Sequence, residues 1–148
     1  MPDRAVVIDS VASLYSQPQA PVDIVTQAVM GAQLSVRERR NAWYYVKMVD
    51  EYPGWIEGRQ IRIYGAGEPP YGSTGQIAEV SSLLAFLYHT ASVSSQAPAA
   101  QVPLGARLSV FLDHGDWLEV ALPDGTVRWM QRGDVDVVSA GTVRPRGD

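Results

Sequence analysis

The sequence contains no cysteine, little charge and no long apolar run. Without cysteine, the chain itself can hold no disulfide, thiolate metal site or cysteine nucleophile. Its longest apolar stretch, the broken run 80–88, is much shorter than the roughly 18 to 20 residues of a membrane-spanning helix, so we expect no membrane span. The 148 residues carry a net charge of −4, and nucleic-acid binding requires a basic face, so we expect no nucleic-acid partner.

The N-terminus has no leader peptide pattern. The first four residues, Met1 to Arg4, are followed by only four apolar residues before Asp9. A chain that natively starts at Met1 is therefore expected in the cytoplasm. A chain from which a signal had been trimmed would instead belong to the cell envelope or the extracellular space.

Metal ligands are also scarce. The two histidines, His89 and His114, lie in different parts of the sequence, and neither has a second ligand type at metal-binding spacing. No glycine-rich loop precedes a helical pattern, so a phosphate-binding loop is excluded. We expect no metal, no cofactor, and solvated loop positions for both histidines.

An internal repeat is the most informative feature that is present. Residues 31–36 (GAQLSV) return 74 positions later as 105–110 (GARLSV). The same offset continues through three further pairs: Trp43 and Trp117, Val46 and Val120, Trp55 and Trp129. Upstream, residues 12–15 (ASLY) match 85–88 (AFLY) at an offset of 73.

The repeat divides the chain into two units, at 5–62 and 79–138. A segment rich in Gly and Pro, 63–78, joins them, and a polar tail, 139–148, follows. Domains of this size bury only about 60% of the surface of their chain, so we expect the two units to pack against each other.

The periodicity within each unit is that of β-strands. Apolar residues alternate at equivalent places in the two copies: Tyr44, Val46 and Met48 correspond to Leu118, Val120 and Leu122. This face should be the core, and the other face, with Trp43 and Trp117, should point outward. Turn residues at 39–42, 113–116 and 123–125 separate the strands. Many short strands predict an all-β fold with two small barrels in tandem.

The order of motifs resembles the bacterial SH3-like (SH3b) domain: 12–15 (ASLY), Gly31, 41–43 (NAW) and 54–56 (GWI). The doubled arrangement resembles the N-terminal region of NlpC-type dipeptidyl-peptidase VI, the γ-D-glutamyl-L-diamino acid cell-wall endopeptidases. In that family, two SH3-like domains precede a papain-like cysteine peptidase that cuts murein (peptidoglycan) peptides. Since the nucleophile is a Cys that this chain lacks, the resemblance implies a chain that is not itself an enzyme.

The resemblance also implies partners and a role. The expected partners are a peptidase domain, in cis or in trans, and a murein peptide. The chain is then either the accessory part of a longer cell-wall hydrolase, packing on the peptidase and helping to gate its substrate, or a free-standing module that binds cell-wall peptide or proline-rich segments. In the family, an acidic residue after the first-strand Tyr and a Tyr before Gly-Trp contribute to the substrate pocket. These positions map to Gln17 and Tyr52, and Gln17 lacks the charge that would hold an ammonium group.

Three aromatic residues are candidates for a ligand groove. Tyr15, Trp43 and Trp55 occupy positions that, by resemblance to eukaryotic SH3 domains, line a shallow groove for extended, proline-rich peptides. The alternative is that these rings cover the thin core of a small barrel and hold the units together. We expect Trp117 and Trp129 to be structural.

Overall fold

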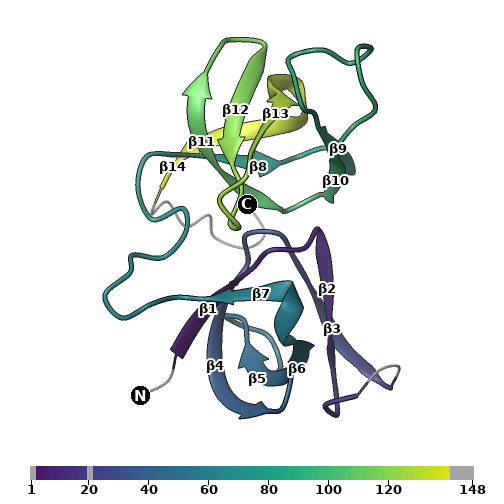
Figure 1. The fold of residues 1–148 in the computed structure, drawn as a ribbon, viewed down its shortest axis with the longest axis vertical. Helices are drawn as coiled ribbons and strands as arrows, with labels where there is room; N and C mark the ends of the chain where they lie inside the picture. The colour runs from purple at the N-terminus through teal and green to yellow at the C-terminus, as the bar shows by residue number, and fades with distance from the viewer. Residues whose placement is uncertain (1–2, 20–21, 141–148) are drawn as a thin grey trace.

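The computed structural model describes residues 3–19 and 22–140. Over these residues the chain forms β-strands and two single-turn 3-10 helices, η1 (Gly58–Gln60) and η2 (Arg132–Asp134) (Figure 1). The all-β prediction is confirmed, and two small β units lie one above the other in Figure 1. No helix within 3–19 and 22–140 has the length and hydropathy needed to cross a membrane. Most of the predicted polar tail, 141–148, lies outside the described residues.

Seven antiparallel strands form the sheet of the first unit, in the spatial order β3-β2-β6-β5-β4-β1-β7. They are β1 (Asp3–Val7), β2 (Val11–Tyr15), β3 (Ile24–Val29), β4 (Gln33–Arg40), β5 (Trp43–Lys47), β6 (Gly54–Glu57) and β7 (Ile61–Ile63). β4 extends further than expected, because Arg39 and Arg40 belong to the strand and pair with β5. The turn shortens to two residues since Asn41 adopts a φ of +53°, which asparagine tolerates better than most residues.

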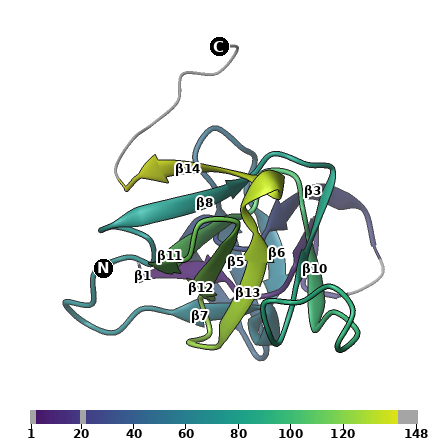
Figure 2. The ribbon, with the colours of Figure 1, turned by 90° about the horizontal axis from the view of Figure 1, so that it is seen from above.

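The second unit repeats this arrangement in two sheets. The larger has the order β13-β12-β11-β8-β14 (Figure 2), and the smaller pairs β9 with β10 (Figure 1). The strands are β8 (Gln76–Val80), β9 (Leu84–Leu87), β10 (Ala100–Pro103), β11 (Arg107–Asp113), β12 (Trp117–Ala121), β13 (Val127–Gln131) and β14 (Val135–Ser139). β5 and β12 start and end 74 residues apart, and so do η1 and η2, as the sequence repeat predicts. The domain boundaries drawn from the sequence stay a prediction.

Neither unit is a closed barrel over the described residues, which corrects the expected barrels. In the first unit, β7 pairs with β1 and leaves β3 at the opposite edge of the sheet. In the second unit, a single bridge between Tyr88 and Trp129 links the smaller sheet to β13. The bridge has two hydrogen bonds: Tyr88 N–H donates to the Trp129 carbonyl at 2.7 Å, and Trp129 N–H donates to the Tyr88 carbonyl at 2.9 Å.

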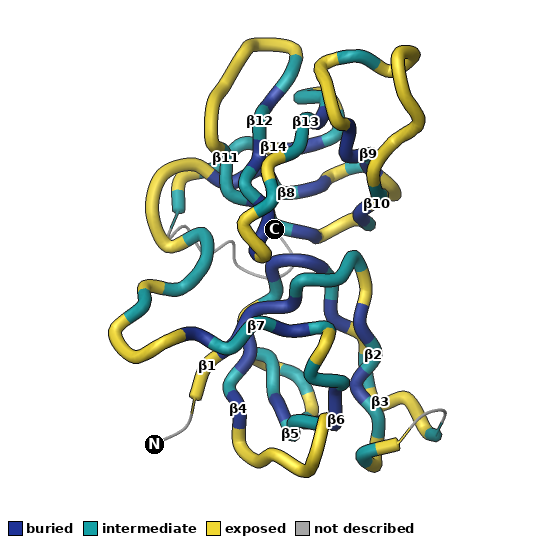
Figure 3. The backbone as a smooth tube through the Cα atoms, viewed as in Figure 1, coloured by how far each residue is buried: buried dark blue, intermediate teal, exposed yellow. Residues whose placement is uncertain are grey.

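Each unit has its own apolar core (Figure 3). Val46 of the first unit and Leu118 and Val120 of the second are completely buried, so the predicted inward face is the core. Trp43 and Trp117 lie half-buried on the other face of their strands.

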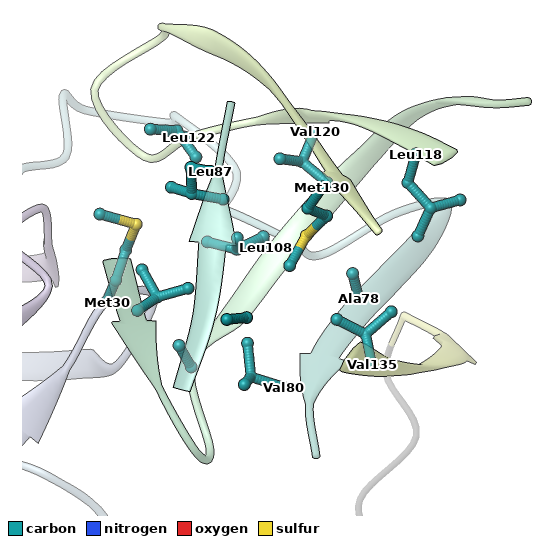
Figure 4. Close-up of a cluster of buried hydrophobic side chains, with 13 residues drawn as sticks. Met30, Ala78, Val80, Leu87, Leu108, Leu118, Val120, Leu122, Met130 and Val135 are labelled. Atoms are coloured by element: carbon teal, nitrogen blue, oxygen red, sulfur yellow. The ribbon is translucent and has the colours of Figure 1, made fainter. Parts of the chain in front are cut away.

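The two cores meet at one turn of the first unit. Met30, which follows β3, is only 5% exposed and belongs to the core of the second unit, in the same cluster of buried side chains as Leu87 and Leu122 (Figure 4). The N–H of Arg107 donates to the Met30 carbonyl at 3.1 Å. A Cβ on Gly31, whose φ is +89°, would overlap the carbonyl oxygen of Arg107. Only glycine allows the backbones to approach this closely, and the units pack against each other.

The connector between β7 and β8 strengthens this contact through Tyr71. Its hydroxyl accepts a hydrogen bond from the N–H of Ser109 at 2.7 Å and donates to the carbonyl of Ala121. Its own N–H donates to the hydroxyl of Tyr64 at 2.8 Å. Burial raises the pKa of the Tyr71 hydroxyl, so it stays protonated and able to donate. Nearby, Arg62 donates from Nε to the carbonyl of Pro123 at 2.8 Å.

Candidate ligand-binding face

The strand register gathers four aromatic residues on one face of the first unit. Tyr15 on β2 lies opposite Trp55 on β6, which lies opposite Tyr45 on β5. Residues that oppose each other in a sheet share a face, and Trp43 joins them because it precedes Tyr45 by two positions. The three predicted groove residues, Tyr15, Trp43 and Trp55, therefore lie together with Tyr45. We call these four residues the aromatic face.

Ring contacts hold the aromatic face in a fixed arrangement. The Tyr15 and Trp43 rings meet edge to face, with centroids 5.9 Å apart and planes at 75°. The Tyr45 and Trp55 rings are tilted, with centroids 5.1 Å apart. The guanidinium of Arg40 lies 5.3 Å from the Trp55 ring centroid, at a distance that allows a cation–π interaction.

The four rings differ in what they offer a ligand. Tyr15, Trp43 and Tyr45 are half-exposed. Trp55 is only 6% exposed, so it forms the floor of the face and presents little surface of its own. The face is charged at its rim: Glu57 lies opposite Trp43 and accepts a hydrogen bond from Arg59 Nε at 2.7 Å. An extended peptide could lie on the exposed rings with its polar groups at this rim.

The two predicted gating residues lie at one end of the same strand pair. β2 ends at Tyr15 and β6 begins at Gly54, and the strands are antiparallel. Gln17, just after β2, and Tyr52, just before β6, are therefore both at the end where Tyr15 and Trp55 meet. Both residues are exposed, and Tyr52 is 79% exposed.

The second unit carries an equivalent set of rings. Tyr88 and Trp117 correspond to Tyr15 and Trp43, and their rings also meet edge to face, with centroids 5.5 Å apart and planes at 78°. His114 takes the position of Arg40 and lies over Trp129, with ring centroids 4.7 Å apart. His114 Nε2 is also 2.8 Å from a carboxylate oxygen of Glu119, which replaces Tyr45.

His114 is exposed, as expected, but the sequence reasoning missed its contacts with Trp129 and Glu119. The 74-residue offset pairs it with Arg40, but spacing alone gives neither contact. The sequence reasoning also missed Tyr45 and Arg40 as parts of the face in the first unit. Tyr45 could have been found from its spacing of two from Trp43 on the predicted strand.

Among residues 3–19 and 22–140, no group of three or more His, Cys, Asp or Glu side chains could hold a metal ion. Asp113 accepts hydrogen bonds from Arg132 and from the N–H of Gly115, and these lower the pKa of its carboxyl group. This pair fixes a hairpin of the second unit.

The structure thus holds two β units with repeated strands, the first with an ordered aromatic face. Residues 14–61 match the family model of the bacterial dipeptidyl-peptidase SH3 domain, which confirms the resemblance predicted from the sequence. This match spans Tyr15, Gln17, Trp43, Tyr52 and Trp55. No curated protein sequence matches the chain.

One solved structure shows the same fold. An NlpC/P60 family protein from Bacillus cereus superposes with a TM-score of 0.74 at 20% identity, covering 93% of this chain and 57% of that one. NlpC2 from Trichomonas vaginalis reaches a TM-score of 0.38 at 11% identity, covering 92% of this chain and 48% of that one. The chain thus spans about half the length of these proteins.

Proposed function

We propose that the chain is the non-catalytic tandem SH3-like region of a murein-peptide cysteine peptidase, and that its first unit helps to gate the substrate. The observation that carries this proposal is the dipeptidyl-peptidase SH3 match over residues 14–61. The matched segment holds both gating candidates, and the strand pairing brings them to one end of the aromatic face.

The exposure of Tyr52 supports the proposed gating role. A ring that is 79% exposed on a loop contributes little to the stability of the unit and is available to a partner. It can cover the end of a short peptide held by a peptidase domain and exclude water there. Gln17 can donate or accept a hydrogen bond beside it, and as a neutral amide it binds an amino group more weakly than a carboxylate would.

The test is kinetic and uses the natural protein together with its peptidase domain. Intact-mass measurement first shows whether the natural chain continues into a Cys-His domain. Tyr52→Ala should then raise KM for a γ-D-glutamyl-diamino acid peptide, whereas Phe111→Ala, an exposed ring of the second unit, should leave KM unchanged. If the natural protein neither contains a peptidase domain nor binds one on a separate chain, the gating proposal is wrong.

The alternative is a stand-alone module that binds cell-wall peptide or a proline-rich segment on the aromatic face. The edge-to-face pair of Tyr15 and Trp43 favours it, since fixed half-exposed rings form a ready platform. Pull-down on purified sacculi discriminates the two functions. Trp43→Ala should weaken binding by a module of this kind, while the equivalent Trp117→Ala should not. If the sacculi retain the wild type and both variants equally, the rings have only a structural role.

A further inference from the structure

The turn of the first unit that packs on the second unit, at residues 30–32, has an equivalent turn in the second unit that is exposed to solvent. We call residues 30–32 and 104–106 the docking turns. They share their backbone hydrogen bonds: the N–H of Gly31 donates to Val7, and the N–H of Gly105 donates to Val80, both at 3.0 Å. Their glycines also share φ values of +89° and +91°. The second docking turn therefore has the shape of the first.

The surroundings of the two docking turns differ. Met30 is 5% exposed in the neighbouring core, whereas the equivalent Leu104 is 52% exposed. A Cβ on Gly105 would meet no atom within 4 Å, in contrast to Gly31. Leu83, whose carbonyl accepts from the N–H of Leu104 at 3.0 Å, is 85% exposed beside it. The second unit thus presents an apolar docking turn to solvent.

The surface that receives the first docking turn also has a counterpart. In the second unit, Met30 and Arg62 of the first unit and Tyr71 of the connector cover a surface that includes Arg107, Leu108, Ser109, Ala121, Leu122 and Pro123. The residues 74 positions earlier are Gln33, Leu34, Ser35, Lys47, Met48 and Val49. Gln33 donates from Nε2 to the carbonyl of Tyr71 at 2.9 Å. All six of these residues line a single cavity of about 280 Å³, which Pro70 of the connector also borders. We call it the open receiving surface.

The open receiving surface suits an apolar group. Val49 is 79% exposed, whereas its counterpart Pro123 is buried beneath the first unit.

The cavity is also lined by Arg4, Arg37 and Lys47 and by no acidic side chain. The second unit is the acidic part of the chain, with 3 Lys or Arg against 7 Asp or Glu in residues 79–138. Its charge therefore complements the cavity.

We propose that two copies of this chain associate by placing the Leu104 docking turn of one copy on the open receiving surface of the other. The contact repeats, between molecules, the contact that Met30 makes within the molecule. One docking turn and one receiving surface are left over in every copy, so the contact is head to tail and joins two copies through one turn and one surface.

Sedimentation of the 148-residue chain between about 10 µM and 1 mM tests the proposal. We expect a weak, reversible association with a Kd of about 0.1 mM, in the range of small transient interfaces. Leu104→Gln should weaken it at least tenfold, because it removes the apolar group without adding a charge that the basic cavity would attract, and so should Val49→Asp on the opposite side. Phe111→Gln, equally exposed in the second unit but outside the docking turn, should leave the Kd unchanged.

Mixing the two disruptive variants gives the sharpest result. The Leu104→Gln chain keeps its receiving surface, and the Val49→Asp chain keeps its docking turn, so an equimolar mixture should form a heterodimer that neither variant forms alone. A wild-type chain that stays monomeric at 1 mM overturns the proposal, and so does an association that both variants retain. A mixture that stays monomeric would also overturn it.

Discussion

Substitution of alanine at Gly31 and at Gly105 separates the contribution of the unit–unit contact from that of backbone conformation. Both glycines have a φ near +90°, which costs an L-residue about 1–2 kcal/mol. The reduced entropy of the unfolded chain offsets about 0.4–1 kcal/mol of that cost. Gly105→Ala meets open space, so we expect it to lower the free energy of unfolding by about 1 kcal/mol.

Gly31→Ala carries a second cost, because the added Cβ overlaps the carbonyl oxygen of Arg107. That oxygen belongs to a paired strand and cannot move alone. Forced overpacking costs about 1–3 kcal/mol. Loss of the hydrogen bond from Arg107 N–H to Met30 adds about 0.5–1.5 kcal/mol. The expected total for Gly31→Ala is about 3–5 kcal/mol, which corresponds to a Tm about 6–20 °C lower.

Urea unfolding followed by tryptophan fluorescence measures both variants against the wild type. The midpoints should fall in the order wild type, Gly105→Ala, Gly31→Ala, with a similar slope m for all three. If Gly31→Ala and Gly105→Ala have the same midpoint, the close approach of the two units does not contribute to stability and the reasoning is wrong.

Three further substitutions test the same interface. Met30→Ala should cost about 2–5 kcal/mol and speed hydrogen exchange in the second unit, although Met30 belongs to the first. Tyr71→Phe should cost about 1–3 kcal/mol in thermal unfolding through two lost hydrogen bonds, while Tyr52→Phe, an exposed control, should stay within about 0.5 kcal/mol. Hydrogen bonds from Arg62 and a backbone N–H lower the pKa of Glu68, so its stabilising effect is present above the ordinary carboxyl pKa and is lost as pH falls through the lowered value. Glu68→Gln should therefore flatten the acid side of a Tm-against-pH curve, and an unchanged curve would contradict this assignment.

The sequence was sufficient for the fold class and for the inward faces of the strands. The alternation that ends in Val46 and Val120 reports which side of a strand is apolar in both copies, and burial follows directly from it. The closure of the sheets could not be predicted in this way. Whether β3 meets β7 depends on the curvature of the whole sheet, and periodicity carries no information on that.

The candidate site was predicted in part for a similar reason. Tyr15, Trp43 and Trp55 were chosen by their motifs, and the strand register does bring them together. Arg40 could not be placed over Trp55 from spacing alone. A β-bulge between Val36 and Glu38 shifts the register of β4 against β5, so that counting from the repeat motif gives the wrong partner.

The sequence repeat does not show the most consequential difference between the units, which is the exposure of the residue before the glycine. Met30 and Leu104 are both apolar residues before a glycine, and a comparison of the two copies treats them as the same. Their exposures of 5% and 52% arise from what lies against them, which is a property of the contact between the units. A duplicated domain starts with two equal docking turns and two equal receiving surfaces, and an asymmetric contact within one chain uses one of each. The remaining turn and the remaining surface are therefore the places where a partner of this chain is most simply accommodated.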